Sequence, residues 1–383
     1  MAQFYSGSPG KLEQVDVLRG IAILLVFGYH WHLTTAQGFL PVKGAFLAFE
    51  NATIQQIAGT FSPLAYGDVG VQLFLVISGF LIHHGQLARG GELNIRKFFA
   101  RRFWRIYPPY LLVLLFFAFV DKQQSAHFLF TEEGRVALVS HIFLVHNFFS
   151  DSGIIFGVNP SFWSIALEAQ LYALYPLFLV LAARLGIRAL CTALFFVHIA
   201  AILGIMYRNG GRPPERLSEM TFVLHYWIVW VLGAVVADFY SRGRRVFNVS
   251  WWKWLILLLT YAASKAFILF FFYFNHIMAA VLWAMLLELV LHSRLSAPGF
   301  WEYVRNALIY VGLCSYSIYL IHQPLIEPLL RYINWADSSR FTPVINGVIT
   351  FVIIFLVSYG MYLFIEQPSI RFGQKLAKQQ DLK

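Results

Sequence analysis

The chain has 383 residues, of which 59% are hydrophobic and only 13% are charged. About a quarter of the residues in a soluble domain are charged, so this composition excludes an ordinary water-soluble globule. The net charge of +10 would suit a nucleic-acid partner in a soluble protein. Here the charges lie between apolar runs, which predicts loops beside a lipid bilayer and no nucleic-acid binding.

Ten apolar runs follow one another, most with the length that crosses a ~30 Å hydrocarbon core. They predict an all-α, polytopic membrane helix bundle with about ten transmembrane helices. A shorter run at 137–149 predicts a re-entrant or interfacial segment, because it is too brief to span comfortably. The ten predicted spans are 15–34, 69–88, 106–121, 162–183, 189–207, 221–240, 252–274, 276–292, 306–330 and 343–365.

The positions of lysine and arginine predict the orientation of these spans. Loops on the N-terminal side hold 18 Lys and Arg residues, and loops on the opposite side hold 8. Short cytoplasmic loops carry the excess of positive charge in membrane proteins, so both termini are expected in the cytoplasm. An even number of spans agrees with this arrangement.

The first predicted span contains charged residues, which are costly in a membrane and therefore indicate function. Asp16 and Arg19 are three residues apart and can pair on one helix face. Arg19 and His30 are eleven residues apart, which places them on the same face and about 16 Å apart along the axis. The alternative is an arginine held by Asp16 for helix packing, with an interfacial histidine.

Two arginines precede the third predicted span, in the expected loop 89–105. Arg102 and Arg105 are three residues apart, so their side chains face one way if the segment is helical. Paired guanidinium groups suit bidentate binding of phosphate. Contact with lipid headgroups is the alternative explanation of the same charges.

Further polar side chains lie in later spans. Ser164 and Glu168 are four residues apart near the outer end of the fourth span, where a carboxylate requires a polar cavity. His322 lies in the ninth predicted span and Glu366 at the inner end of the tenth. The twelve histidines show no HExxH or Cys/His ligand spacing, so no metal site is predicted.

Taken in order, six segments resemble the membrane acyltransferase-3 family from about Val15 to Arg371. In the family pattern an arginine and a histidine stand on the first span, and a Ser-Gly-Phe element stands on the second. The remaining segments are an Arg-x-x-Arg followed by Ile-x-Pro, a Trp-Ser-x-x-x-Glu and two closing segments. The matching residues and segments here are Arg19, His30, Ser78, Gly79, Phe80, Arg102, Arg105, Ile106, Pro108, Trp163, Ser164, Glu168, SYSIYLIHQP and FIEQPSIR.

The resemblance implies transfer of an acyl group, commonly acetyl, from cytoplasmic acyl-CoA to a carbohydrate or glycolipid hydroxyl at the extracytoplasmic side. It implies one integral domain over 1–383 with its core at 15–371, in the bacterial inner membrane, with no permanently bound cofactor. Gln72 departs from the acidic residue that members often carry there. The chain stops at Lys383 without the hydrolase-like domain of some members. Either a separate extracytoplasmic transferase or direct transfer is therefore expected.

The predicted roles join this resemblance to the chemistry of the side chains. His30 is expected to act as general base or as transient acyl carrier, because imidazole accepts protons near neutral pH. Arg19 would polarise the thioester or bind the pantetheine arm, and Arg102 and Arg105 would hold the CoA phosphates. Glu168 would orient His30 or the acceptor. The segment from Ser78 to Phe80 would allow close helix approach around the donor.

A transporter or flippase of a lipid-linked or anionic substrate is the alternative, with Arg19, Glu168 and His322 along its path. Transporters often carry internal repeats and broken helices in corresponding halves, and the sequence shows no such duplication. The identity of the acceptor, the choice between acetyl and another acyl group, and the oligomeric state remain open.

Overall fold

The computed structural model describes residues 12–34, 67, 69–120, 122–211, 217–264, 268–293, 299–333 and 342–379. Within these ranges the regular elements are helices, and no β-strand occurs. The all-α fold class is therefore confirmed. The predicted loops around Lys43, Arg212 and Arg340 lie outside the described residues.

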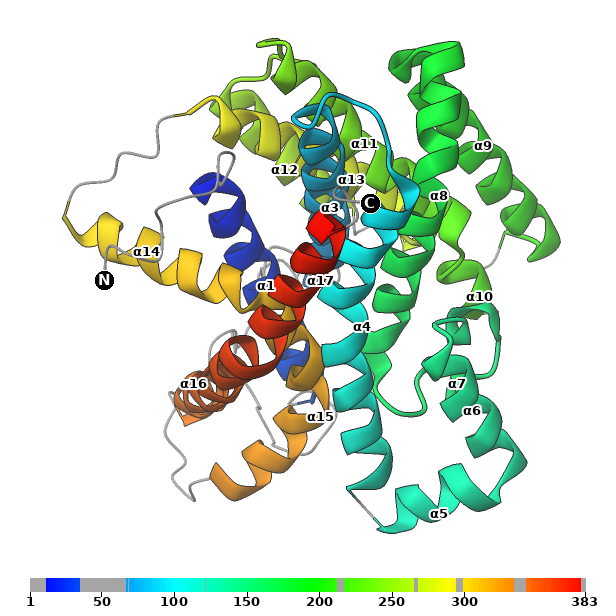
Figure 1. Cartoon of the computed structure of the whole chain (residues 1–383), viewed down its shortest axis with the longest axis vertical. Coiled ribbons are helices and arrows are strands. Elements are labelled where there is room, and N and C mark those ends of the chain that lie inside the picture. The colour runs from blue at the N-terminus through cyan, green and yellow to red at the C-terminus, as the bar shows by residue number, and fades with distance from the viewer. Residues whose placement is uncertain are drawn as a thin grey trace.

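Helices of very different length make up the bundle (Figure 1). They are α1 (Glu13–Thr34), α3 (Val69–Leu87), α4 (Ile95–Phe119), α5 (Lys122–Phe130), α6 (Glu132–Ile142), η4 (His146–Phe148), α7 (Ser152–Ile155), η5 (Pro160–Phe162), α8 (Trp163–Leu185), α9 (Ile187–Arg208), α10 (Leu217–Met220), α11 (Val223–Ser241), α12 (Trp251–Ser264), α13 (Ile268–Leu291), α14 (Phe300–Leu313), α15 (Ser315–Ile333), α16 (Thr342–Met361), the π-turn η6 (Tyr362–Glu366) and α17 (Gln367–Gln379).

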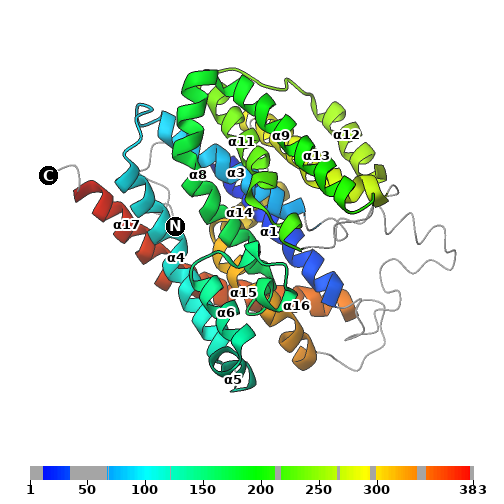
Figure 2. The ribbon, with the colours of Figure 1, turned by 90° about the vertical axis from the view of Figure 1, so that its right-hand side faces the viewer.

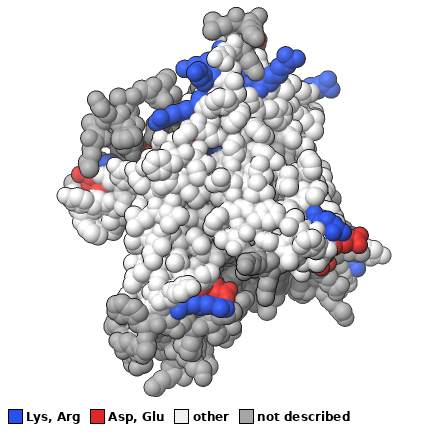
Figure 3. Space-filling model, turned by 60° about the horizontal axis from the view of Figure 1, so that its bottom comes forward, with Lys and Arg blue, Asp and Glu red and all other residues white. Residues whose placement is uncertain are grey.

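Seven of the described helices are long and apolar enough to cross a membrane, or eight if the bent α14–α15 pair forms one span. The outer surface agrees with a bilayer environment, because the face in Figure 3 has a broad area without charged side chains between its charged edges. The chain is an integral membrane helix bundle, and the count of ten spans stays a prediction.

Three boundaries differ from the prediction. Helix α4 begins at Ile95 with Asn94 as its N-cap, so the second half of the expected loop 89–105 is helical. The predicted spans 252–274 and 276–292 meet near 275, whereas α12 ends at Ser264 and α13 begins at Ile268. The predicted span 306–330 is two helices bent by 77° around Cys314. Hydropathy records apolar character and does not register a bend within an apolar run.

Glycine allows α3 and α11 to pack with their backbones in close contact. A Cβ on Gly79 would lie 2.0 Å from the Trp230 carbonyl oxygen, and one on Gly233 would lie 1.9 Å from the Val76 carbonyl oxygen. Such small residues replace the hydrophobic effect as a source of close packing inside a membrane. The predicted close approach at Gly79 is thus present, and it fixes the helix that carries Ser78.

The C-terminal helix supports α4 on the side of the arginines. Helices α17 and α4 lie side by side in both views of the ribbon (Figures 1 and 2). The rings of Trp104 and Phe372 meet at 4.4 Å, and Ser369 donates a hydrogen bond to the Trp104 carbonyl. This packing fixes the turn of α4 between Arg102 and Arg105.

Candidate active site

A cavity of about 280 Å³ lies among five helices of the bundle. Its volume is near the lower end of small-molecule pockets, so it suits the reactive end of a ligand rather than a whole nucleotide. Helices α1, α3, α4, α8 and α15 contribute its polar lining, which consists of Arg19, Ser78, Arg102, Arg105, Ser164, Glu168, Tyr172, Ser315, Tyr316 and Tyr319.

Arginines from two helices enter this cavity. Arg19 comes from α1, while Arg102 and Arg105 come from successive turns of α4. Three guanidinium groups that line one cavity favour an anionic ligand, since phosphates accept their paired N–H groups.

Two acidic residues balance part of this charge. Asp16 lies 3.6 Å from the Arg19 guanidinium, which confirms the predicted pair on α1. Glu366 is buried in the π-turn and accepts a 2.7 Å hydrogen bond from Ser317, and its charge acts on Arg105. A π-turn often marks a functional position in a helix, and here it places a carboxylate close to the cationic cavity.

Glu168 is held by hydroxyl groups in the middle of the cavity. Its Oε1 accepts a hydrogen bond from Ser78 at 2.9 Å and another from Tyr172 at 2.5 Å. The guanidinium carbon of Arg102 lies 5.6 Å from the centre of the Tyr172 ring. The carboxylate therefore belongs to a network with Ser78 and Tyr172. Its predicted role in orienting His30 or the acceptor stays a prediction.

His30 is paired with another histidine. Nδ1 of His30 lies 2.9 Å from Nε2 of His322, and Nδ1 of His322 lies 2.9 Å from the Tyr319 carbonyl oxygen. A carbonyl only accepts, so this network assigns the His322 proton to Nδ1 and leaves its Nε2 as acceptor. His30 then donates from Nδ1, and its Nε2 keeps a lone pair that can accept a proton.

The histidine pair adjoins the cavity without lining it. Tyr319 lines the cavity and its hydroxyl lies 2.6 Å from the Ser164 hydroxyl. His322 is one turn further along α15, with its ring centre 5.5 Å from that of Tyr319. The Ser164–Tyr319 hydroxyl pair therefore stands between the cavity lining and His322, the hydrogen-bond partner of His30.

Two of the predicted site residues, Phe80 and Trp163, pack against other aromatic side chains. Phe80 is fully buried and stacks on His84, away from the cavity lining. Trp163 packs with Tyr226 at the start of α8. The cavity tyrosines 172, 316 and 319 were not predicted, because a tyrosine in an apolar run resembles an interfacial anchor until its hydroxyl partner is known.

The class of this protein follows from comparison with known families. A family model described as an acyltransferase domain matches residues 12–363. The chain therefore belongs to the acyltransferase-3 family, and the predicted membership is confirmed. Its class is that of a membrane acyltransferase.

The chain is also similar to individual bacterial proteins. It is 26% identical to the putative peptidoglycan O-acetyltransferase YrhL of Bacillus subtilis, over 88% of this chain and 56% of that protein. It is 22% identical to the peptidoglycan O-acetyltransferase OatA of Listeria monocytogenes, over 94% of this chain and 56% of that protein. It is 26% identical to the O-acetyltransferase OatA of Staphylococcus aureus, over 96% of this chain and 58% of that protein. The chain thus spans little more than half of these relatives, and no solved structure matches it.

Proposed function

We propose that this chain transfers an acetyl group from cytoplasmic acetyl-CoA to a hydroxyl group of a carbohydrate on the opposite side of the membrane. The observation that carries the proposal is the cavity, which has arginines from α1 and α4 at one part and adjoins the His30–His322 pair at another. Membership of an acyltransferase family and similarity to proteins named O-acetyltransferases support this chemistry.

In this proposal the donor enters from the side of the arginines. Arg102 and Arg105 hold the CoA phosphates, and the narrow cavity receives the pantetheine arm. Arg19 binds that arm rather than the thioester carbonyl, because about 16 Å of helix separates the Arg19 and His30 levels. The Glu168 network provides hydrogen-bonding groups along the way.

The reaction takes place at the free Nε2 of His30. This nitrogen removes the proton of the acceptor hydroxyl as the oxygen attacks the thioester carbonyl carbon. When the tetrahedral intermediate collapses, the carbon–sulfur bond breaks and the CoA thiolate takes the proton from the imidazolium. His322 stays hydrogen-bonded to Nδ1 throughout and maintains the reactive tautomer, a positioning role.

The acceptor is a sugar hydroxyl of a surface glycan. Peptidoglycan is the first choice, because two relatives are named peptidoglycan O-acetyltransferases. We place the protein in the bacterial inner membrane with both termini in the cytoplasm. The acetyl group either reaches the glycan directly or is passed to a separate extracytoplasmic transferase.

A sided assay tests this function. The full-length protein is reconstituted in sealed proteoliposomes, its orientation is determined, and labelled acetyl-CoA is added on the face of Arg102. A glycan or its soluble oligosaccharide is enclosed on the other face. We expect labelled acetyl ester on the enclosed sugar, and none in vesicles carrying His30→Ala protein.

Two results would contradict the proposal in different ways. Product formed only when donor and acceptor share the cytoplasmic compartment would refute transfer across the membrane. Absence of acetyl transfer or acetyl-CoA hydrolysis, together with movement of an anionic solute through the vesicle membrane, would favour the transporter alternative.

A further inference from the structure

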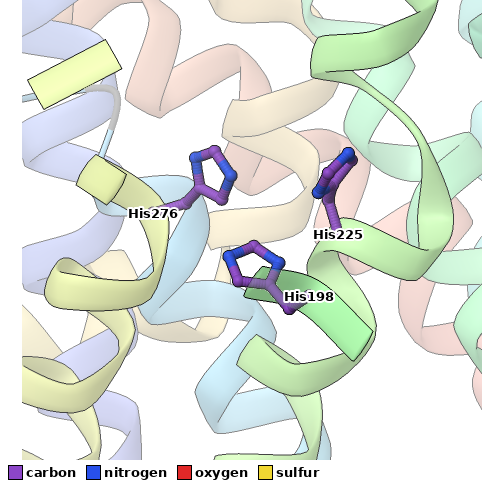
Figure 4. Close-up of side chains that lie close together, drawn as sticks. All are labelled: His198, His225 and His276. Carbon is purple, nitrogen blue, oxygen red and sulfur yellow. The ribbon is translucent and has the colours of Figure 1, made fainter. Parts of the chain in front are cut away.

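Three histidines that are far apart in the sequence meet inside the bundle. His198 lies on α9, His225 on α11 and His276 on α13, and one ring nitrogen of each lies within 4.8 Å of the others. Figure 4 shows the three rings around a common space between these helices. None of the cavity-lining residues comes from these three helices, so the histidine cluster is separate from the candidate active site.

Three ring nitrogens of this cluster lack a hydrogen-bond partner among the described residues. His198 and His225 are 1% and 5% exposed. Both ring nitrogens of His198 and Nδ1 of His225 are buried and have no hydrogen-bond partner among the described residues. Leaving such a group unsatisfied costs about 1–3 kcal/mol, so three of them at one place indicate a missing ligand.

The donor set indicates the chemistry of that ligand. Neutral imidazole is a good ligand for zinc and neighbouring transition metals, and three histidines form a known type of zinc site with an open fourth position. Ligands at ~2.05 Å in a tetrahedron lie about 3.3 Å from one another. The three nitrogens already lie within 4.8 Å of one another, near that separation.

The position of His198 indicates what a bound ion would do. Along the fully described helix α9, the buried side chains are Leu190, His198 and Ile202, so its apolar contact with the bundle is small. A metal joining His198 to α11 and α13 would add a strong link at the centre of this contact.

We propose that His198, His225 and His276 bind one divalent transition-metal ion, with zinc as the favoured ion, and that this ion clamps α9 to α11 and α13. The sequence does not predict this site, because its ligands are separated by 27 and 51 residues and form no motif. The histidines first become neighbours when the helices pack.

Metal analysis of purified protein tests the site. The full chain is purified with an affinity tag that contains no histidine, exposed to zinc, and dialysed against a weak chelator. We expect about one zinc ion per wild-type chain. His198→Gln and His276→Gln should lose it, while His127→Gln, a change on α5, should retain it. With cobalt in place of zinc, the wild-type protein should show the absorption spectrum of a tetrahedrally coordinated ion. The two cluster variants should not show it.

Thermal unfolding gives a second measurement for variants that remain monodisperse in detergent. Zinc should raise the midpoint of wild-type and His127→Gln protein and leave both cluster variants unchanged, since only a ligand bound to the folded state stabilises it. Wild-type protein without zinc, or equal zinc content and equal stabilisation in the cluster variants, would overturn the proposal. Neither measurement depends on acyl transfer, so failure of the proposed enzymatic function leaves this test intact.

Discussion

At the scale of single residues, the hydrogen-bond direction around His30 determines its chemistry. The Tyr319 carbonyl assigns one proton to His322, and His322 in turn assigns the Nδ1 proton to His30. The arrangement resembles the way in which an acidic residue orients the histidine of a catalytic triad, with a neutral imidazole in the acidic residue's place. Proton acceptance at His30 Nε2 is the consequence.

His30→Ala should lower the rate of acetyl transfer by about 10²–10⁴-fold, because the base that removes the hydroxyl proton is gone. His32→Ala, an exposed position on the same helix, is the matched control and should keep the wild-type rate. Initial rates with equal amounts of monodisperse protein measure the effect. A wild-type rate in His30→Ala protein would refute the assignment.

His322 should act on the rate constant of the reaction rather than on substrate binding. His322→Leu removes the acceptor for the His30 Nδ1 proton and should reduce kcat by about 10²-fold with KM nearly unchanged, as expected for a misoriented group. His322→Gln offers a carbonyl oxygen in its place and should recover part of the loss. Equal kcat for the two variants would indicate a purely structural residue.

Arg102→Ala and Arg105→Ala should each lower the affinity for acetyl-CoA by about tenfold or more. The reason is that a hydrogen bond to a charged group contributes about 1.5–3 kcal/mol to binding. Lysine at either position should restore only part of the affinity, because bidentate contact is lost. Calorimetry with a non-hydrolysable acetyl-CoA analogue measures this. Arg96→Ala, an exposed arginine on the same helix, is the control, and donor affinity equal to wild type in all variants would favour lipid contact instead.

The sequence predicted many residues of the cavity but few of their partners. Charged groups such as Arg19 and Glu168 stand out in apolar runs, because burial in lipid is too costly without a purpose. The partner of His30 lies 292 residues away, and the tyrosine that binds Glu168 resembles any interfacial tyrosine. Pairings of this kind depend on helix packing, which spacing along one helix does not reveal.

At the scale of helices, the apolar runs predicted that a helix exists more accurately than they predicted where it ends or bends. Helix α1 agrees closely with the predicted span 15–34, since a single continuous apolar run forms it. The bend at Cys314 lies inside such a run, and beside it Gly312 allows α14 to contact the Asp16 carbonyl of α1. A side chain at position 312 would collide with the backbone of α1. A hydropathy profile cannot show such a contact.

The glycine contact between α3 and α11 gives a prediction at this scale. Gly79→Ala or Gly233→Ala would place a methyl group against the partner backbone and should destabilise the protein by about 1–3 kcal/mol. Gly204→Ala on α9 meets open space and is the matched control. Thermal unfolding in detergent should show lower midpoints for the first two variants, and an unchanged midpoint for both would refute tight packing here.

At the scale of the whole molecule, the cavity and the histidine cluster lie in different groups of helices. Helices α1, α3, α4, α8 and α15 surround the cavity, while α9, α11 and α13 carry the histidine cluster. The close α3–α11 contact joins the two groups. The cavity of the first group is lined by Arg102, Glu168 and the Ser164–Tyr319 pair, so the direction of the proposed transfer depends on which membrane face each end meets.

The orientation of the chain therefore decides the mechanism, and it can be measured without substrate. The charge bias predicts that Ser241, at the end of α11, lies in the cytoplasm and that Ser150, before α7, lies outside. An even number of crossings also requires both termini on one side. Seven crossings would place them on opposite sides, so α4, α12 and the α14–α15 pair must together contribute an odd number.

Single cysteines at these positions test the orientation in a protein whose two native cysteines, Cys191 and Cys314, are replaced by alanine. In intact cells an impermeant maleimide should label Ser150→Cys and should label Ser241→Cys only after the membrane is opened. Reporters fused to either terminus should both be active in the cytoplasm. Labelling of Ser241→Cys from outside would invert the bundle and place the arginines away from the compartment where acyl-CoA is made, which would exclude the proposed direction of transfer.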